Sequence, residues 1–154
     1  MDGVEMEMKF VNIIKRLMSG SYETMTGHPD APKRFEEFVK EIREKIPELA
    51  GKDDWEVEDT VLEAIDFARH KLCKPIRTAE YAPTGINHYE GVAVYSCYHP
   101  SVGNFYLTVQ EEEDGDTGYG FFGFTLTRDK REAMRLYKSV VKEWKERGIK
   151  YEEW

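Results

Sequence analysis

The chain has 154 residues, of which 40% are hydrophobic and 34% are charged, and its formal net charge is −8. This composition is typical of one folded domain with a hydrophobic core, and the aromatic content of 13% argues against a disordered chain. No apolar run approaches the ~20 residues of a membrane span, and the first residues lack the basic and apolar segments of a signal peptide. We therefore expect a single cytoplasmic domain over residues 1–154.

The first half of the chain carries apolar side chains at the helical period of three to four residues. Asp30 stands where a second helix should begin and suits an N-cap, and Asp53 followed by Glu56 is typical of a capping box. The expected helices and their core positions are residues 4–18 with Met8, Val11, Ile14 and Leu17 or Met18, residues 31–46 with Phe35, Phe38, Val39, Ile42 and Ile46, and residues 53–72 with Val57, Val61, Ile65, Ala68 and Leu72.

After Pro75 the period of the sequence changes from helical to the two-residue alternation of β-strands. Pro100–Asn104 has the composition of a turn, and Glu111–Gly118 that of an acidic loop. Because the connections are short, we expect neighbouring strands to pair as an antiparallel meander. The predicted strands are residues 92–99, 105–109 and 119–126, with a short edge strand at 76–81.

A final amphipathic helix follows the strands, with Thr127 or Asp129 as its N-cap and Gly148 at its end. The sequence therefore predicts an α+β fold with about three N-terminal helices, a three- to four-stranded antiparallel meander and a C-terminal amphipathic helix. We expect the helices to pack on one face of the sheet. The single domain then has a helical part over about 4–74 and a sheet with the final helix over about 76–150.

The final helix carries the most unusual charge pattern of the chain. Residues 128–150 contain nine Lys and Arg against four Asp and Glu, whereas the remaining residues contain 13 basic and 26 acidic side chains. Six basic residues recur every three or four positions and so share one helical face, which we call the basic face: Arg128, Arg131, Arg135, Lys138, Lys142 and Lys145. The expected buried positions on the opposite face are Ala133, Leu136, Tyr137, Val140, Val141 and Trp144.

The two cysteines allow a zinc hypothesis that the spacing does not support. Cys73 follows His70 by three positions on a helix, and Cys97 precedes His99 by two on a strand, so the four side chains could form a tetrahedral zinc site. The paired spacings of zinc modules are absent, however, and two cysteines are too few for a disulfide scaffold. We therefore predict no metal and no cofactor, with both cysteines acting as small buried hydrophobes.

Cys97 and His99 also have the residue types of a nucleophile and its base. Such a pair needs oxyanion donors and a group that orients the base, and the sequence identifies neither. We therefore predict no catalytic residue. A small enzyme or ligand-binding domain stays an alternative, and it requires His88, Glu90, Cys97 and His99 to converge in one concave pocket.

Two further motifs have ordinary structural interpretations. Residues 118–123 match GxGxxG, but a dinucleotide fingerprint follows a strand and opens a helix, whereas these glycines follow an acidic loop and precede more strand. The acidic loop itself lacks the ligand positions and flanking helices of an EF-hand. Aromatic residues are dense in the strand region, and strand alternation predicts that some of them face outward: Tyr81, Tyr89, Tyr95, Tyr98, Phe105, Tyr106, Tyr119, Phe121, Phe122 and Phe124.

The sequence as a whole favours a non-enzymatic interaction or regulatory module. Its expected partner is an acidic protein or a phosphate-bearing ligand, bound through the basic face, while the acidic remainder of the chain disfavours general binding to DNA. A second alternative is that the acidic body mimics the charge of nucleic acid and inhibits a basic protein. The sequence leaves a homo-oligomer open.

Overall fold

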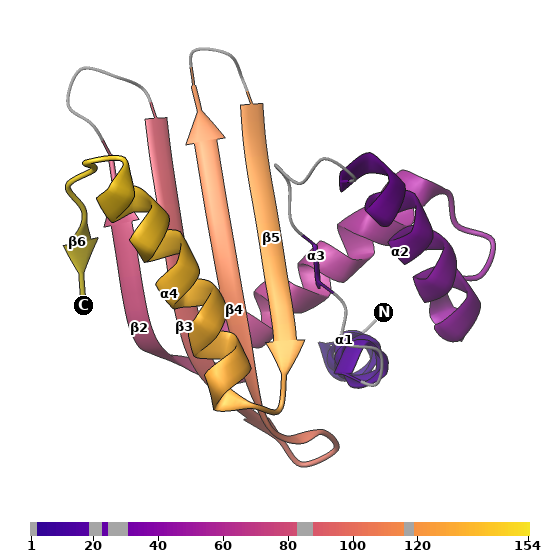
Figure 1. The fold of residues 1–154 in the computed structure, drawn as a ribbon. Coiled ribbons are helices and arrows are strands. Elements are labelled where there is room, and N and C mark those ends of the chain that lie inside the picture. Colours follow the sequence, from indigo (N-terminus) through magenta and orange to yellow (C-terminus); the bar gives the residue numbers. More distant parts are fainter. Residues whose placement is uncertain (1–2, 19–22, 25–30, 83–87, 116–118) are drawn as a thin grey trace.

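The computed structural model describes residues 3–18, 23–24, 31–82, 88–115 and 119–154. Four α-helices and six strands follow one another along this part of the chain (Figure 1). Their bounds are α1 Gly3–Met18, β1 Glu23–Thr24, α2 Ala31–Lys45, a 3-10 turn at Pro47–Leu49, α3 Asp54–Lys71, β2 Cys73–Tyr81, β3 His88–His99, β4 Gly103–Asp114, β5 Tyr119–Thr127, α4 Lys130–Glu146 and β6 Glu152–Glu153.

The strands form one antiparallel sheet in the order β1-β5-β4-β3-β2-β6. The four long strands, β2 to β5, are a meander in chain order, and the two-residue strands β1 and β6 lie at its edges. The predicted α+β fold is therefore confirmed, with three N-terminal helices, a four-strand meander and a C-terminal helix.

The helices cover both faces of the sheet, so the expectation that they pack on one face is wrong (Figure 1). Leu107 and its register partner Tyr95 face α1 to α3, whereas Val94 and its partner Thr108 face α4. The physical reason is that the central strands present apolar side chains to both faces, and each face needs a cover. Two separate hydrophobic clusters result, one on each side of the sheet.

The N-terminal helices build the larger cluster much as their periodicity predicts, except that Met8 of α1 is 61% exposed, so its expected core position is wrong. Asp53 caps α3 by accepting a hydrogen bond from the Glu56 backbone N–H at 3.0 Å, as expected. The expected cap at Asp30 and the side chains of Phe35 and Phe38 lie outside the described residues. The buried helical side chains of this cluster are Val11, Ile13, Ile14, Leu17, Val39, Ile42, Ile46, Leu49, Val57, Val61, Ala64, Ile65 and Ala68.

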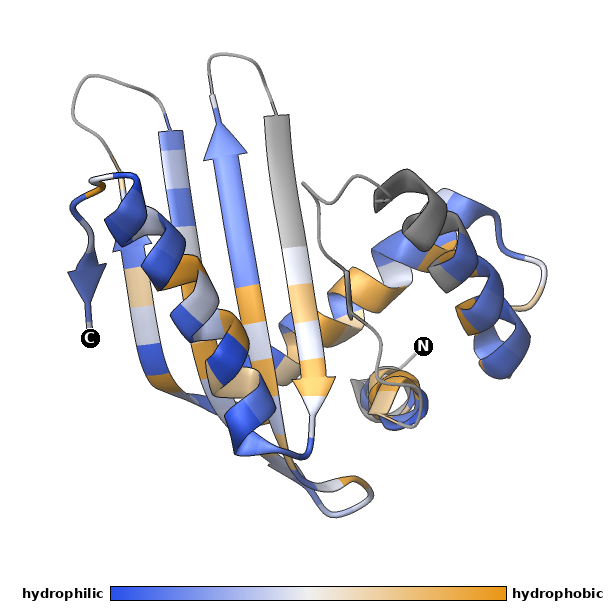
Figure 2. Ribbon diagram, in the orientation of Figure 1, coloured by the Kyte–Doolittle hydropathy of each residue, from blue (hydrophilic) through white to orange (hydrophobic). Residues whose placement is uncertain are grey.

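The strands β4 and β2 are both longer than predicted. β4 continues to Asp114, so the first part of the expected acidic loop is strand, paired with β3 on one side and β5 on the other. Glu111 within it forms an ion pair with Arg69 of α3 at 2.6 Å. Figure 2 shows the resulting change along β4 from hydrophobic residues to a hydrophilic end. β2 begins at Cys73 and accommodates Pro75 through a shift of register, the kind of position where a strand tolerates proline.

Cys73 and Cys97 are joined by a disulfide bond, which corrects the prediction of two free, buried thiols. The two residues are directly opposite in the β2–β3 register, with their Cα atoms 4.0 Å apart. The bond ties the start of β2, immediately after α3, to the far end of β3. A disulfide limits the conformations of the unfolded chain, so it stabilises the junction between the helical part and the sheet.

Reduction of the disulfide should therefore destabilise the fold. For a bond that closes a loop of this size we expect a loss of about 2–4 kcal/mol, or a fall in Tm of roughly 5–15 °C, measured by circular dichroism with and without dithiothreitol. The Cys73→Ala/Cys97→Ala variant is the control, and its Tm should not respond to dithiothreitol. An equal response of wild type and variant would contradict the stabilising role.

The helix α4 is fixed to the sheet by one buried hydrogen bond as well as by apolar packing. The hydroxyl of Thr108, which is fully buried, donates to the carbonyl oxygen of Ala133 in the first turn of α4 at 2.9 Å. Thr125, its partner across β4 and β5, also has a buried hydroxyl, but that hydroxyl has no hydrogen-bond partner in the described part of the chain. The two threonines form a natural pair for comparison.

Replacing each threonine by valine should separate the hydrogen bond from the packing. Thr108→Val should lower the free energy of unfolding by about 1 kcal/mol, because the hydrogen bond is lost while the shape is kept. Thr125→Val should be neutral or slightly stabilising, because it removes a buried hydroxyl that is unpaired in the fold. Chemical denaturation measures both effects, and equal losses in the two variants would contradict the assignment.

Candidate functional site

The helix α4 is closed at both ends by local interactions and buries its apolar side. Asp129 accepts a hydrogen bond from the Arg131 backbone N–H at 2.9 Å, so it is the cap, and Thr127 supports it by accepting from the Asp129 N–H. Gly148 adopts a positive φ of 73° just beyond the helix, as its predicted place at the end requires. Leu136 is half-buried, and the fully buried positions of the predicted apolar face are Ala133, Tyr137, Val140, Val141 and Trp144.

All six residues of the basic face are exposed in the structure. Arg128 lies before α4 and donates a hydrogen bond to the Asn104 carbonyl oxygen at 3.1 Å, so it is partly committed to the fold. Arg135 pairs with Glu132 at 2.9 Å and Lys142 with Glu146 at 3.9 Å. These exposed pairs within one helix are weak.

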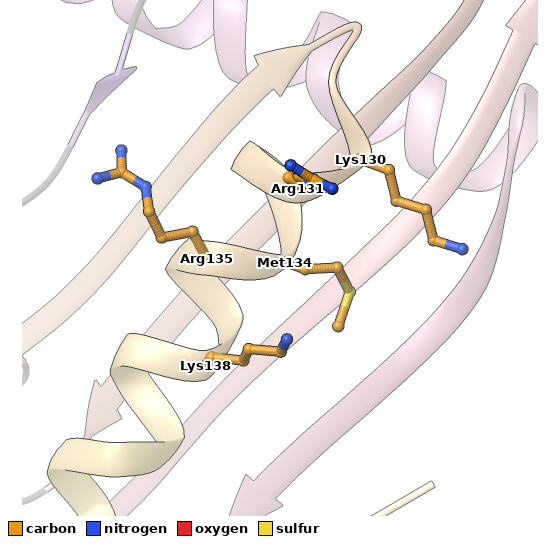
Figure 3. A pocket seen from close by; sticks show the side chains of 5 residues that line it. All are labelled: Lys130, Arg131, Met134, Arg135 and Lys138. Carbon is orange, nitrogen blue, oxygen red and sulfur yellow. The ribbon is translucent and has the colours of Figure 1, made fainter.

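Arg131 and Lys138 form no ion pair with any residue that the structure describes. Together with Lys130, Met134 and Arg135 they line a shallow depression of about 570 Å³ on the outer surface of α4 (Figure 3). In this view Lys130, Met134 and Lys138 extend from one side of the helix and Arg135 from the other. The half-buried Met134 gives the depression an apolar element among four cations.

The C-terminal strand supports the other half of α4. One carboxylate oxygen of Glu153 accepts hydrogen bonds from the Tyr137 hydroxyl and from Arg77 Nε, each at 2.6 Å. The guanidinium of Arg77 also lies 5.0 Å from the centre of the Tyr137 ring. The hydrogen bond from Tyr137 lowers the pKa of Glu153, and the contacts with Arg77 lower it further. β6 was not predicted, because two residues are too few to show a strand period.

The backbone beside Glu153 completes this attachment. Glu153 is opposite Ala79 in the register of β6 with β2, and Trp154 exchanges backbone hydrogen bonds of 2.7 and 2.8 Å with Thr78. A second groove, of about 340 Å³, runs between this strand and α4. Its lining residues are Arg77, Tyr137, Lys138, Val141, Lys142, Lys145, Tyr151 and Glu153.

The residues of the alternative catalytic site do not converge. Cys97 is part of the disulfide, so its sulfur is not the thiolate that a nucleophile or a zinc ligand requires. His99, near the same end of β3, accepts a hydrogen bond at Nδ1 from the Ser101 backbone N–H at 3.0 Å. His70 lies on the exposed end of α3, 3.3 Å from a carboxylate oxygen of Asp66. The four residues of the zinc hypothesis therefore do not form a metal site.

His88 and Glu90 lie at the opposite end of β3, where they meet Glu112 of β4. His88 Nε2 is 3.6 Å from a carboxylate oxygen of Glu90 and 3.9 Å from one of Glu112. We call these three residues the His88–Glu90–Glu112 cluster. Burial raises the pKa of Glu112, and the negative charge of Glu90 raises it further. Sequence reasoning named the first two residues but missed Glu112, whose place opposite Glu90 depends on the strand register.

The remaining motifs have structural roles where the structure describes them. Residues 119–123 of the GxGxxG match belong to β5, so no helix follows the glycines, and Gly118 lies outside the described residues. Of the aromatic positions expected in the strands, Tyr98 is exposed at 56%, and the others whose side chains are described are buried or half-buried. The side chains of Tyr119, Phe121 and Phe122 lie outside the description.

Comparisons with protein-family models, with curated proteins and with solved structures found no match to this chain. Within the described residues, no helix is both long and apolar enough to cross a membrane.

The lowered pKa of Glu153 predicts how the C-terminal strand responds to acid. A carboxyl group whose pKa is lower in the fold stabilises the fold above its unfolded value of about 4.3, and this contribution is lost as the pH falls through the folded value. We expect the amide of Thr78 to lose protection from hydrogen exchange over that range, before the core of β3 does. Carbon NMR of the carboxyl groups measures the pKa of Glu153 directly.

The control is Tyr137→Phe, which removes the hydroxyl that contributes most to the lowered pKa. In this variant the pKa of Glu153 should rise toward its ordinary value. Glu152→Gln, an exposed change in the same strand, should leave the pKa nearly unchanged. A wild-type Glu153 that titrates at or above the ordinary value would contradict the role assigned to this hydrogen-bonded group.

Proposed function

We propose that this chain is a non-enzymatic interaction module that binds an acidic protein or a phosphate-bearing ligand through the basic face of α4. The observation that carries the proposal is the exposed surface of Arg131, Arg135 and Lys138 around the depression of α4. The apolar side of the same helix is already buried on the sheet, so the helix has no further need of a cover from within the fold.

The dimensions and charges of this surface suit an extended anionic partner. α4 has 17 residues, so the basic face extends over about 25 Å at 1.5 Å per residue. The ion pair of Arg135 with Glu132 is exposed, and a partner carboxylate or phosphate can replace it at little cost. The acidic remainder of the chain repels the same partner elsewhere, which favours one orientation of approach.

Among anionic partners, an acidic protein surface fits the depression better than a small free phosphate. Met134 offers a flexible apolar side chain between cations, and methionine adapts well to apolar groups of a protein partner. A small phosphate would use the cations but leave this apolar contact unused. Four of the six cations of the basic face lie between Arg131 and Lys142 of α4. Such a row of cations suits a stretch of several carboxylates better than a single anionic group.

The compartment in which the module acts depends on the disulfide. The cytoplasmic location expected from the sequence stays a prediction. The bond between Cys73 and Cys97 weighs against it, because disulfides persist in oxidising compartments and are rare in the cytosol of most organisms. Trapping of free thiols in freshly lysed source cells distinguishes the two locations, since a cytosolic chain would be labelled at both cysteines.

Charge reversal on α4 tests the proposed surface. Arg135→Glu/Lys138→Glu should keep Tm nearly unchanged, because exposed substitutions usually cost within ~0.5 kcal/mol. Capture of the chain on immobilised polyglutamate should fall by about tenfold or more, and added salt should have the same effect on the wild type. A parallel surface of immobilised tripolyphosphate distinguishes a carboxylate preference from a phosphate preference.

The matched control reverses two exposed lysines on the other side of the sheet, Lys40→Glu/Lys71→Glu. It changes the net charge by the same amount as the α4 variant, so its capture should stay close to that of the wild type. Equal loss in both variants would mean that only net charge matters. Unchanged capture by the α4 variant would exclude the basic face as the binding surface.

A further inference from the structure

The polar end of β3 and β4 brings together three side chains that can ligate a metal ion. Their donor atoms, one from each of His88, Glu90 and Glu112, all lie within 4.8 Å of one another. In the part of the chain that the structure describes, no other group of three His, Cys, Asp or Glu side chains meets this condition. The cluster is on the α4 side of the sheet, away from the basic face, which is on the outer surface of the helix.

A second observation is that the cluster contains an unsatisfied buried oxygen. The Glu90 side chain is only 14% exposed, and its Oε2 atom is buried without a hydrogen-bond partner among the residues that the structure describes. A carboxylate oxygen removed from water needs a donor or a cation, because its desolvation otherwise goes uncompensated. The neighbouring side chains of His88 and Glu112 are 19% and 30% exposed, so the cluster is sheltered but open on one side.

The surrounding residues hold the cluster in place. The ring of Tyr81 lies 6.0 Å from that of His88, and Trp144 of α4 packs edge-on against Tyr81 at 5.1 Å. The Glu90 carboxyl group also lies close enough to Tyr81 to act electrostatically on its hydroxyl. Arg147 at the end of α4 is close enough to act electrostatically on Glu112, and it pairs with Glu143 at 3.8 Å.

We propose that the His88–Glu90–Glu112 cluster is a binding site for a divalent transition-metal ion, with Zn²⁺ as the ion that its geometry favours. One imidazole and two carboxylates are ligands that zinc accepts, and calcium and magnesium sites use oxygen ligands alone. This inference is independent of the partner-binding function proposed for α4.

The distances between the donor atoms fit a tetrahedral ion. Zinc bonds of about 2.0–2.2 Å at tetrahedral angles separate two ligand atoms by about 3.4 Å. The His88 Nε2 atom is 3.6 Å from Glu90 Oε1 and 3.9 Å from Glu112 Oε1, so small side-chain movements bring all three to bonding distance. Three protein ligands leave the fourth position to water or to a ligand, as in zinc sites that are not purely structural.

Calorimetric titration of the full chain with zinc chloride tests the site, after dialysis against a chelator and without reductant. We expect about one zinc ion per chain and a rise in Tm of roughly 5–10 °C at a free zinc concentration of 100 times Kd. Glu90→Gln and His88→Gln should each weaken zinc binding by about tenfold or more. Circular dichroism without zinc checks that both variants fold.

Two matched variants distinguish the site from adventitious surface binding. Glu113→Gln changes the exposed neighbour of Glu112 on the other face of β4, and His70→Gln removes a histidine paired with Asp66. Neither should change the affinity for zinc. Cobalt chloride in place of zinc should give the intense visible absorption of a four-coordinate ion in the wild type, and this absorption should be lost in His88→Gln.

Three outcomes would overturn the proposal. One is wild-type binding that is no tighter than that of Glu90→Gln and His88→Gln. Another is a loss of affinity in the two matched variants equal to that in the cluster variants. The third is the weak cobalt spectrum of a hydrated ion, which would mean that His88 and the two carboxylates are only a structural ion pair. A failure of polyglutamate capture would not affect these results, because that test changes Arg135 and Lys138 only.

Discussion

The fold depends on the need to cover an apolar sheet from both sides. Val92, Ala93 and Val94 are consecutive in β3 and all buried, so neither face of the central strands can be left to water. The three N-terminal helices cover one face, and α4 is the only helix among the described residues on the other. Because α4 has this task by itself, it keeps one buried apolar side and leaves its opposite side entirely in solvent. The exposure of the basic face is thus a consequence of covering the sheet with helices on both sides.

Much of this fold could be predicted because it depends on local periodicity. The apolar stripes of α1, α3 and α4 and the caps at Asp53 and Asp129 are properties of neighbouring residues. Apart from the exposed Met8, the structure has them where the sequence indicates. Features that depend on pairing between distant segments could not be predicted. The disulfide requires Cys73 to face Cys97 across β2 and β3, and the extension of β4 to Asp114 depends on partners on both sides. The prediction that all helices pack on one face of the sheet was wrong for the same reason. The alternation of residues in one strand does not show whether helices cover one face of the sheet or both.

The two candidate sites differ in the same way. The basic face lies within one helix, so the spacing of its residues was enough to predict it. The His88–Glu90–Glu112 cluster draws on two strands, and only His88 and Glu90 are related by a spacing that can be read directly. The feature of the sequence that could have identified Glu112 as a member of the cluster is the position of the turn between β3 and β4. Once His99 is paired with Gly103, antiparallel register places Glu90 opposite Glu112, but a turn predicted one or two residues away would have selected a different residue.

The charges of the chain's own residues divide the basic face into two parts. At its C-terminal end, Glu153 and Lys145 interact electrostatically, and the adjacent Arg147 acts on Glu112. The acidic strand ends therefore offset part of the positive charge there. Lys138 and Arg131 lie about two and four helical turns from Lys145, and exposed charges are screened over about 8 Å at physiological ionic strength. The N-terminal half of α4 thus keeps most of its positive potential, and it is the half that carries the depression with Met134. The anionic partner that we propose would gain most by docking there, while Lys142 and Lys145 would contribute mainly to its long-range attraction.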